Sequence, residues 1–339
     1  MKIKVVLVGG AGFIGHNIAL RLKKDNFEVF VVDGLNVNNL LTFQERDFEN
    51  RSLYRSILNN RLDLLQNEKI ELQIQDARSY HSISKIIDNY NPDVIIHLAA
   101  VSHSNRSNKD PHSTFDHSLR TLENVLDASK GKKKIPHLIY ISSSMVYGNF
   151  DGKEVKEDDK LSPIGIYGTL KLSGELMVKA YNQVFGMPYT IIRPSALYGE
   201  RCVSRRVSQI FIENSLLGKE ITINGDGREK LDFTYIEDLY HGIFRCIQSK
   251  NSKNQIFNIT YGQGREVKEL VNILEKKISK VKLKFLPKNE LTPERGTLST
   301  KKARELLDYN PSFNLEKGYS KYIDWYLKFF ENFKKQNVI

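Results

Sequence analysis

A glycine-rich segment after the first apolar run places the strongest constraint on the fold. The chain begins "MKIKVVLVGGAGFIG", in which Gly9, Gly12 and Gly15 are spaced three residues apart. The run before the glycines is typical of a buried strand, and apolar residues recur at helical spacing after them. Glycines in such a turn let a pyrophosphate approach the helix N-terminus, where free N–H groups and the helix dipole favour anions. The segment predicts a dinucleotide site, the alternative being a glycine turn that binds nothing.

A carboxylate follows the second apolar run at the position that a dinucleotide site requires. The run 28–33 ends in Asp33, 18 residues after Gly15. A carboxylate there can accept hydrogen bonds from the ribose 2′-hydroxyl of the adenosine, and it would repel a 2′-phosphate. The sequence therefore predicts NAD rather than NADP.

Apolar, β-branched runs alternate with helical periodicity through the first part of the chain. They span residues 3–8, 28–33, 93–99, 137–142 and 189–194. Near-continuous apolar strands between helices indicate a doubly wound α/β fold with a parallel sheet covered on both faces. From about residue 195 the pattern changes to helices with short strands at 221–224, 255–259 and 281–286. We expect a Rossmann-type domain over 1–190, with a return segment at 233–262, and a smaller α/β domain over 191–232 and 263–339.

A long polar segment lies between the second strand and Asp76. Within residues 37–70, leucine and isoleucine recur at helical spacing from Leu53 onward, which predicts one or two inserted helices. A flap, an oligomer contact and an inert insertion are all compatible with this pattern.

Composition excludes several classes of protein. The 339 residues are 40% apolar and carry a net charge of +11, but the lysines are scattered and form no basic stripe with aromatic residues. This argues against nucleic-acid binding, whereas a small anionic substrate fits the charge. The two cysteines, Cys202 and Cys246, exclude a disulfide framework and favour a reducing compartment. No signal peptide and no run of about 18 apolar residues is evident, so we expect a cytoplasmic protein without a membrane partner.

The stretch "SPIGIYGTLKLSGE", residues 162–175, places Tyr167 four residues before Lys171. On a helix these side chains share one face, and the ammonium would lower the phenol pKa from its usual value of about 10. Tyr167 would then be a usable base near neutrality. Taken alone, the pair is equally consistent with an ordinary helix surface.

Several motifs in order resemble the extended short-chain dehydrogenase/reductases, in particular the nucleotide-sugar epimerases and dehydratases. They are the glycine spacing, "HLAA" at 97–100, "SSSMVYG" at 142–148 and "YGTLK" at 167–171. The resemblance continues through "IIRPSALYGE", "NGDGREKLDFTYIEDL" and "KARELLDYNPSFNLEKGYSKYIDWY", and so covers nearly the whole chain. It implies NAD as cofactor, a nucleotide-diphosphate sugar as substrate for the smaller domain, and a homodimer formed through a four-helix bundle.

The resemblance also implies roles for individual residues. Ser143 would hold the sugar hydroxyl that is oxidised, Tyr167 would take its proton, and Lys171 would bind the nicotinamide ribose and keep Tyr167 acidic. The implied cofactor contacts are Gly9, Gly12, Phe13, Ile14, Gly15, Asp33, Asp76, Ala77, Leu98, Ala99, Ala100, Tyr167, Lys171 and Pro194.

At the substrate end the sequence departs from the family pattern in two places. Ala196 stands where epimerases of the UDP-galactose type usually have asparagine, and Leu231 stands where they have arginine. The substrate or its pose could therefore differ. The expected substrate contacts are Ser102, Ser143, Ser144, Arg205, Arg206 and Arg295, of which Arg295 in "PERGTL" matches the diphosphate-binding arginine. Arg228 and Lys230 are further candidates, and solvated surface charge is the alternative for every arginine and lysine in this group.

Metal binding is not expected. Histidines 97, 103, 112, 117 and 137 lack the ligand spacing of a metal site, although His103 could face the sugar with Ser102.

The residues after Ser143 bear on the type of reaction. Dehydratases of the family carry an Asp-Glu pair directly after the active-site hydroxyl residue, and this chain has Ser144 and Met145 there. The sequence therefore favours an NAD-dependent epimerase acting at C4 through a transient 4-keto sugar. The alternatives are a nucleotide-sugar 4-dehydrogenase or keto-sugar reductase, a 4,6-dehydratase, and a regulatory scaffold that holds NAD without turnover.

Overall fold

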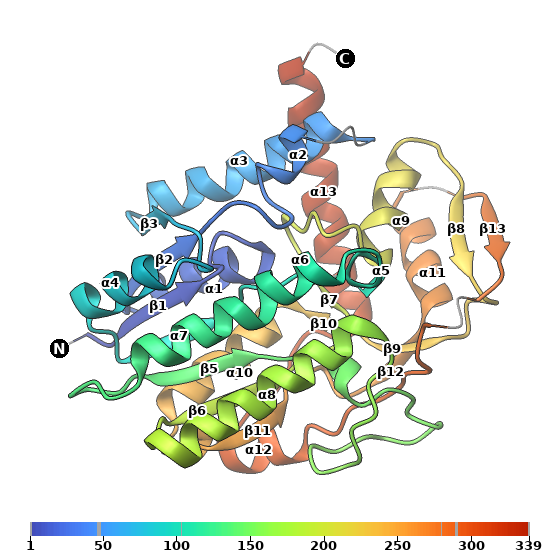
Figure 1. The fold of residues 1–339 in the computed structure, drawn as a ribbon. Helices are drawn as coiled ribbons and strands as arrows, with labels where there is room; N and C mark the ends of the chain where they lie inside the picture. Colours follow the sequence, from blue (N-terminus) through green and yellow to red (C-terminus); the bar gives the residue numbers. More distant parts are fainter. Residues whose placement is uncertain (1, 46–48, 103, 279, 289–290, 338–339) are drawn as a thin grey trace.

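A seven-stranded parallel sheet forms the centre of the molecule (Figure 1). The computed structural model describes residues 2–45, 49–102, 104–278, 280–288 and 291–337. The strands are β1 Lys4–Val8, β2 Glu28–Asp33, β3 Glu71–Ile74, β4 Val94–His97, β5 His137–Ile141, β6 Tyr189–Arg193 and β11 Gln255–Asn258. Their order is β11-β6-β5-β4-β1-β2-β3. Successive strands run to either side of β1, so the carboxyl ends of β1 and β4 border the crevice where α/β sheets bind ligands.

Each face of the sheet is covered by helices because side chains alternate along the strands. Val5 and Leu7 of β1 belong to one core, whereas Val6 and Val8 belong to the other. The first core is closed by α1 Phe13–Lys24, α3 Arg51–Asn67 and α10 Ile236–Gln248. The second is closed by α4 Tyr80–Tyr90, α7 Thr121–Ser129 and α8 Gly165–Phe185, which lie side by side in Figure 1.

All five apolar runs in the first part of the sequence form strands of this sheet, which confirms the predicted fold class. Strand β11 pairs with β6, so residues 255–258 belong to the main sheet. Strand β3 falls outside the apolar runs because it is the edge strand, and three of its four residues are exposed.

The segment 37–70 contains two helices, as predicted, α2 Thr42–Glu45 and α3. The inward face of α3 is part of the first core: Leu53, Ile57 and Leu65 are buried there. The Tyr54 hydroxyl donates a 2.7 Å hydrogen bond to Glu213 on α9 Val207–Leu216. These contacts make α3 a packed structural element rather than a flap.

The second half of the chain adds three two-stranded sheets and further helices around the carboxyl ends of the main strands. The strands are β7 Leu197–Tyr198 with β10 Thr234–Tyr235, β9 Lys230–Asp232 with β12 Gly264–Glu266, and β8 Ile221–Asn224 with β13 Leu283–Leu286. The remaining helices are α5 Ser104–Lys109, α6 Pro111–Phe115, the π-helical turn Asp116–Arg120, the 3₁₀ turns η2 Ser144–Val146 and η3 Lys250–Ser252, α11 Val267–Lys277, α12 Lys301–Leu307 and α13 Leu315–Asn337. Among the described residues, none of these helices combines the length and apolar character needed to span a bilayer.

Candidate active site

The glycine turn between β1 and α1 is shaped by contacts that a side chain would block. Gly9 adopts φ +81° and donates its N–H to Val32 O at 2.8 Å. A Cβ atom on Gly9 would lie 2.6 Å from Ala99 N, and one on Gly15 would lie 2.4 Å from the Cα of Gly10. These two glycines therefore permit close packing of the turn against β4 and of α1 against the turn.

Gly12 serves a different purpose in the same turn. Its backbone is extended, with φ −70° and ψ −179°, which any residue can adopt. A Cβ atom there would meet only Gly9 O, at 3.3 Å. The glycine leaves free space at the N-terminus of α1, as a bound pyrophosphate requires.

A cleft opens over this turn, at the carboxyl ends of β1, β2 and β4. Eleven of the fourteen predicted cofactor residues line it: Gly9, Gly12, Phe13, Ile14, Gly15, Asp33, Asp76, Ala77, Leu98, Ala99 and Ala100. The other three lie outside this lining. Pro194 follows β6, and Tyr167 and Lys171 lie on the first turns of α8.

Asp33 is held rigidly at the mouth of the cleft. Its carboxylate accepts the N–H of Ala11 at 2.9 Å and the N–H of Leu35 at 2.7 Å. Burial raises the pKa of Asp33, and these two backbone N–H groups act against that rise. The carboxylate is therefore oriented before any ligand arrives, as the predicted ribose acceptor must be. Asp76, on the same cleft, forms an ion pair with Arg78 at 2.6 Å.

The predicted catalytic residues converge where α8 crosses the end of β5. Ser143 follows β5 directly and is buried, and its hydroxyl accepts the N–H of Met145 at 3.2 Å. A Cβ atom on Gly168 would lie 2.7 Å from Met145 O. Gly168, the residue after Tyr167, thus allows α8 to approach η2, the turn that follows Ser143.

Lys171 is buried one turn farther along α8. Its ammonium donates a 2.7 Å hydrogen bond to Ile141 O and lies 5.1 Å from the centre of the Tyr140 ring. Burial lowers the pKa of Lys171 to about 8, while the nearby Glu175 carboxylate raises it. The group is therefore a fixed cation below about pH 8, one helical turn after the tyrosine that it is predicted to activate.

A buried ion pair packs beside Ser142, the residue before Ser143. The sequence did not predict this pair. Arg193 and Glu175 form a 2.7 Å pair with almost no exposed surface. Glu175 also accepts a hydrogen bond from Ser142, the residue before Ser143, and Arg193 donates to the Tyr147 hydroxyl at 2.9 Å. The one available signal was spacing, since Glu175 lies four residues after Lys171 on the same helix face.

The two adjacent arginines expected at the substrate end are separated by the structure. Arg206 lines the cleft and donates to Ser102 O at 3.2 Å, and Ser102 lines the cleft too. Arg205 has φ +53° and an exposed side chain whose charge acts on Glu49 and Tyr54, near α3. Of these two arginines, Arg206 lines the cleft and Arg205 lies toward α3.

Arg295, also predicted to bind the substrate, lies within electrostatic reach of Arg206 and Tyr167. Burial, together with the Arg206 guanidinium, lowers the pKa of Arg295 to about 10, and the Tyr167 hydroxyl raises it. Two guanidinium groups that repel each other near Tyr167 form a region suited to an anion.

The other predicted substrate residues have varied surroundings. Ser144 is buried and donates its N–H to Pro194 O at 2.9 Å. Arg228 is exposed and paired with Asp226, and Lys230 is exposed, which fits the surface-charge alternative. His103 lies outside the described residues.

The two departures from the family pattern are packed against the interior. Leu231 is buried in the first core, and Ala196, with φ +35°, packs against the same core. Neither residue is among those that line the cleft.

The described histidines do not assemble a metal site. In the described part of the chain no three His, Cys, Asp or Glu side chains are grouped as metal ligands. Burial lowers the pKa of His97 to about 3 and that of His137 to about 4, so both are neutral core residues.

Comparison with known proteins places the chain in a family. Residues 5–260 match the model of the NAD dependent epimerase/dehydratase family. The chain is 30% identical to an uncharacterized UDP-glucose epimerase, YtcB, of Bacillus subtilis, with 93% of this chain and 95% of that protein covered. It is 29% identical to UDP-glucuronate 4-epimerase 1 of Arabidopsis thaliana, with 97% of this chain and 77% of that protein covered.

A solved structure of a related enzyme has a similar fold. The fold is similar to that of UDP-glucuronic acid 4-epimerase from Bacillus cereus, crystallised with UDP-glucuronic acid and NAD. The TM-score is 0.86 at 27% identity, and the comparison covers 96% of this chain and 99% of the other.

Proposed function

The chain belongs to the NAD dependent epimerase/dehydratase family, and on that premise we propose that it inverts C4 of a UDP-linked hexose or hexuronic acid. It is an NAD-dependent enzyme of this family, and the glycine turn with Asp33 fits that cofactor. The observation that carries the proposed reaction is the buried Lys171 ammonium, fixed to Ile141 O beside the Ser143 segment and Tyr167.

Ser143, Tyr167 and Lys171 divide the proton chemistry between them. The Ser143 hydroxyl would hold the C4 hydroxyl of the sugar, and the Tyr167 phenolate oxygen would take its proton. The Lys171 ammonium would stabilise the phenolate electrostatically and bind the nicotinamide ribose. When bound, NAD supplies reversible hydride transfer at the same carbon. On the return step Tyr167 would give the proton back to the C4 oxygen after the sugar ring has turned over.

The residues after Ser143 support epimerisation over dehydration. Ser144 and Met145 occupy the buried η2 turn, at the positions where the family's dehydratases carry an acidic pair. Elimination of water needs an acid and a base at the sugar, and these two side chains supply neither.

We propose that the nucleotide diphosphate binds at the substrate end through Arg206 and Arg295. Guanidinium groups bind phosphate oxygens through paired N–H donors. In this proposal the cofactor is held by one domain, residues 1–190 with 233–262. The nucleotide sugar is bound by the other, residues 191–232 with 263–339.

We also propose that the enzyme is a homodimer in the cytoplasm. Apolar side chains exposed on α6 and α8 support a second copy of the chain as partner: Phe115, Leu176, Val184 and Phe185. Light scattering should give twice the chain mass for the native protein and a monomer for Leu176→Glu. Both cysteines are free thiols, which fits a reducing compartment.

The test of the reaction is incubation of the purified enzyme and NAD with UDP-glucose, UDP-galactose, UDP-glucuronic acid and UDP-galacturonic acid. Mass spectrometry and proton NMR should find a product of unchanged mass with an inverted coupling at C4. Loss of water would establish a dehydratase, and loss of two hydrogens with accumulation of NADH would establish a dehydrogenase. Binding of NAD without any product would favour the scaffold alternative.

A further inference from the structure

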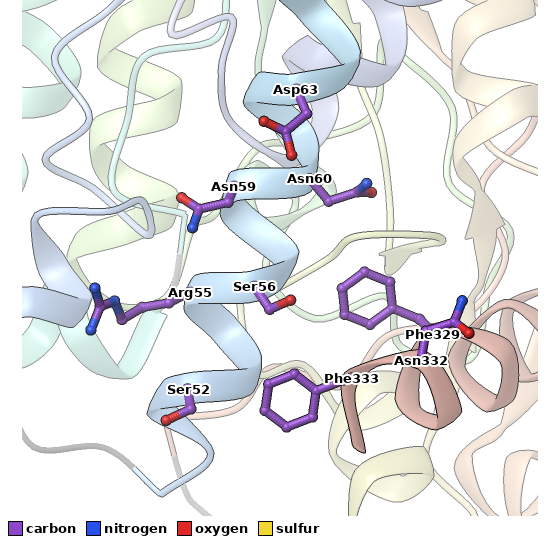
Figure 2. Close-up of a pocket in the computed structure, with 9 residues that line it drawn as sticks. All are labelled: Ser52, Arg55, Ser56, Asn59, Asn60, Asp63, Phe329, Asn332 and Phe333. Atoms are coloured by element: carbon purple, nitrogen blue, oxygen red, sulfur yellow. The ribbon is translucent and has the colours of Figure 1, made fainter. Parts of the chain in front are cut away.

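Helix α3 carries an arginine on its buried face. The polar residues Ser52, Ser56, Asn59 and Asp63 line an outer groove between α3 and α13 (Figure 2). Arg61 instead belongs to the inward set, four residues after Ile57 and four before Leu65, and it is only 1% exposed. An arginine is almost never fully buried without partners for its N–H groups.

Only part of the Arg61 guanidinium is satisfied by the protein. Its Nε and Nη2 both donate to Arg201 O, the Nε bond measuring 3.0 Å. Its Nη1 is buried and has no hydrogen-bond partner among the residues that the structure describes. A buried N–H donor of a charged group without an acceptor is costly, so its position calls for an acceptor that the chain does not supply.

The Arg61 side chain lies at the cofactor cleft. Arg61 lines the cleft together with Gly12, Asp33 and Asn38. The Asp33 carboxylate and the His16 ring both respond electrostatically to its charge. Arg61 is therefore at the end of the cleft where the glycine turn and the ribose acceptor lie, away from Tyr167 and Lys171.

We propose that Arg61 is a cofactor-binding residue, which donates its free Nη1 N–H to a pyrophosphate oxygen on the ADP half of the dinucleotide. The cofactor in its binding site is part of the function proposed above, and Arg61 adds an anchor to it from the inserted helix. Such an anchor slows cofactor release, which matters for an enzyme that must use the same cofactor molecule for both hydride transfers.

Arg61 also has a structural role, and the test must distinguish this role from cofactor binding. By holding Arg201 O, it ties α3 to the segment after β7. The Arg201 side chain in turn donates to His16 Nε2 at 2.9 Å, and His16 Nδ1 donates to Gly12 O at 2.8 Å. Loss of Arg61 should therefore lower the stability of the apo protein as well as its affinity for the cofactor.

The test compares Arg61→Gln with Tyr54→Phe. The second variant removes another bond that holds α3, to Glu213, without touching the cleft. Calorimetric titration of cofactor-stripped protein would use NAD, ADP and adenosine, and stopped-flow fluorescence would follow NADH release from the loaded enzyme. Neither readout depends on epimerase activity.

Arg61→Gln should lower the affinity for NAD and for ADP about 10- to 100-fold, as expected for the loss of a charge-assisted hydrogen bond. The rate of NADH release should rise by a similar factor. The affinity of Arg61→Gln for adenosine should stay within about twofold of wild type. The affinities of Tyr54→Phe for all three ligands should also stay within about twofold. Unchanged affinity for NAD and ADP in Arg61→Gln would overturn the proposal, and an equal loss for adenosine would overturn the phosphate assignment.

If Arg61→Gln does not fold, the crystal structure of the wild-type protein with NAD decides the matter. A phosphate oxygen within about 3.2 Å of Nη1 would support the proposal, whereas a water molecule in that place would overturn it. Failure of the epimerase assay with intact NAD binding would overturn the proposed reaction and leave this inference standing.

Discussion

The cofactor end and the sugar end of the active site are assembled in different ways. The cofactor end takes most of its lining from short segments that directly follow β1, β2, β3 and β4, including 9–15 and 98–100, and α3 adds Arg61. The sugar end draws Ser143, Tyr167, Arg206 and Arg295 from segments that lie far apart in the sequence. The first end is determined by local turns at the edge of one sheet, whereas the second depends on long-range packing.

The difference has a functional consequence. A site made of contiguous turns can hold the same cofactor in many related chains, because its geometry follows from the sheet itself. A site made of distant loops changes with each loop, and so it can change its substrate without disturbing the cofactor. Variants at the two ends should therefore separate cofactor binding from turnover.

The largest effect is expected where the two ends meet. Tyr167→Phe removes the proposed base but keeps an aromatic ring at this position of α8. We expect kcat to fall by about 10²- to 10⁴-fold, the usual contribution of a general base, with NAD content unchanged. Coupled assay and HPLC of the released cofactor measure the two quantities. A loss of kcat below about fivefold would remove Tyr167 from the chemistry.

Gly12→Ala should affect the cofactor end alone. The backbone of Gly12 suits alanine, and the added methyl group would enter the space reserved for the pyrophosphate. We expect NAD affinity to fall about 10- to 100-fold, equivalent to the 1–3 kcal/mol of an overpacked contact. The Tm of the apo protein should be nearly unchanged. An equal fall in apo stability would instead identify a folding defect.

Arg206→Ala and Arg205→Ala form a matched pair at the sugar end. Arg206 lines the cleft, whereas Arg205 faces Glu49 and Tyr54. Arg206→Ala should raise KM for the UDP-sugar about tenfold, the value of one charge-assisted hydrogen bond, and Arg205→Ala should change it less than about twofold. Steady-state kinetics at saturating NAD would measure both, and equal effects would contradict the separation of the two arginines.

The smallest effect concerns pH. Because burial lowers the pKa of Lys171 to about 8, its ammonium is present below that pH and is lost as the pH rises through it. We expect kcat/KM of the wild type to decline above about pH 8. Glu175→Gln removes a carboxylate that raises this pKa, so the decline should move to lower pH.

This pH prediction needs a control for folding. Glu175→Gln leaves the buried Arg193 unpaired, which costs roughly 3–5 kcal/mol, so rates should be measured below the Tm of the variant. A decline near pH 10 in both proteins would show that Lys171 does not set the alkaline limit.

The sequence alone determined the architecture and the cofactor end of this protein. Alternating apolar runs and helical periodicity specify a parallel sheet, and Gly9, Gly12, Gly15 and Asp33 specify its ligand, because each of these signals lies within a few consecutive residues. The spacing of Tyr167 and Lys171 is local in the same sense. The sequence also predicted the inserted helices, although it did not indicate what they contact.

Only the tertiary structure decided which charged side chains face the site. The left-handed backbone of Arg205 turns it away from its neighbour Arg206, and a residue pattern does not encode such a change of direction. Glu175 meets Arg193, and Arg61 reaches the cofactor cleft, because helices distant in sequence pack against the sheet and against one another. A buried charge acquires its role from partners that the fold brings to it, and those partners are not adjacent in the sequence.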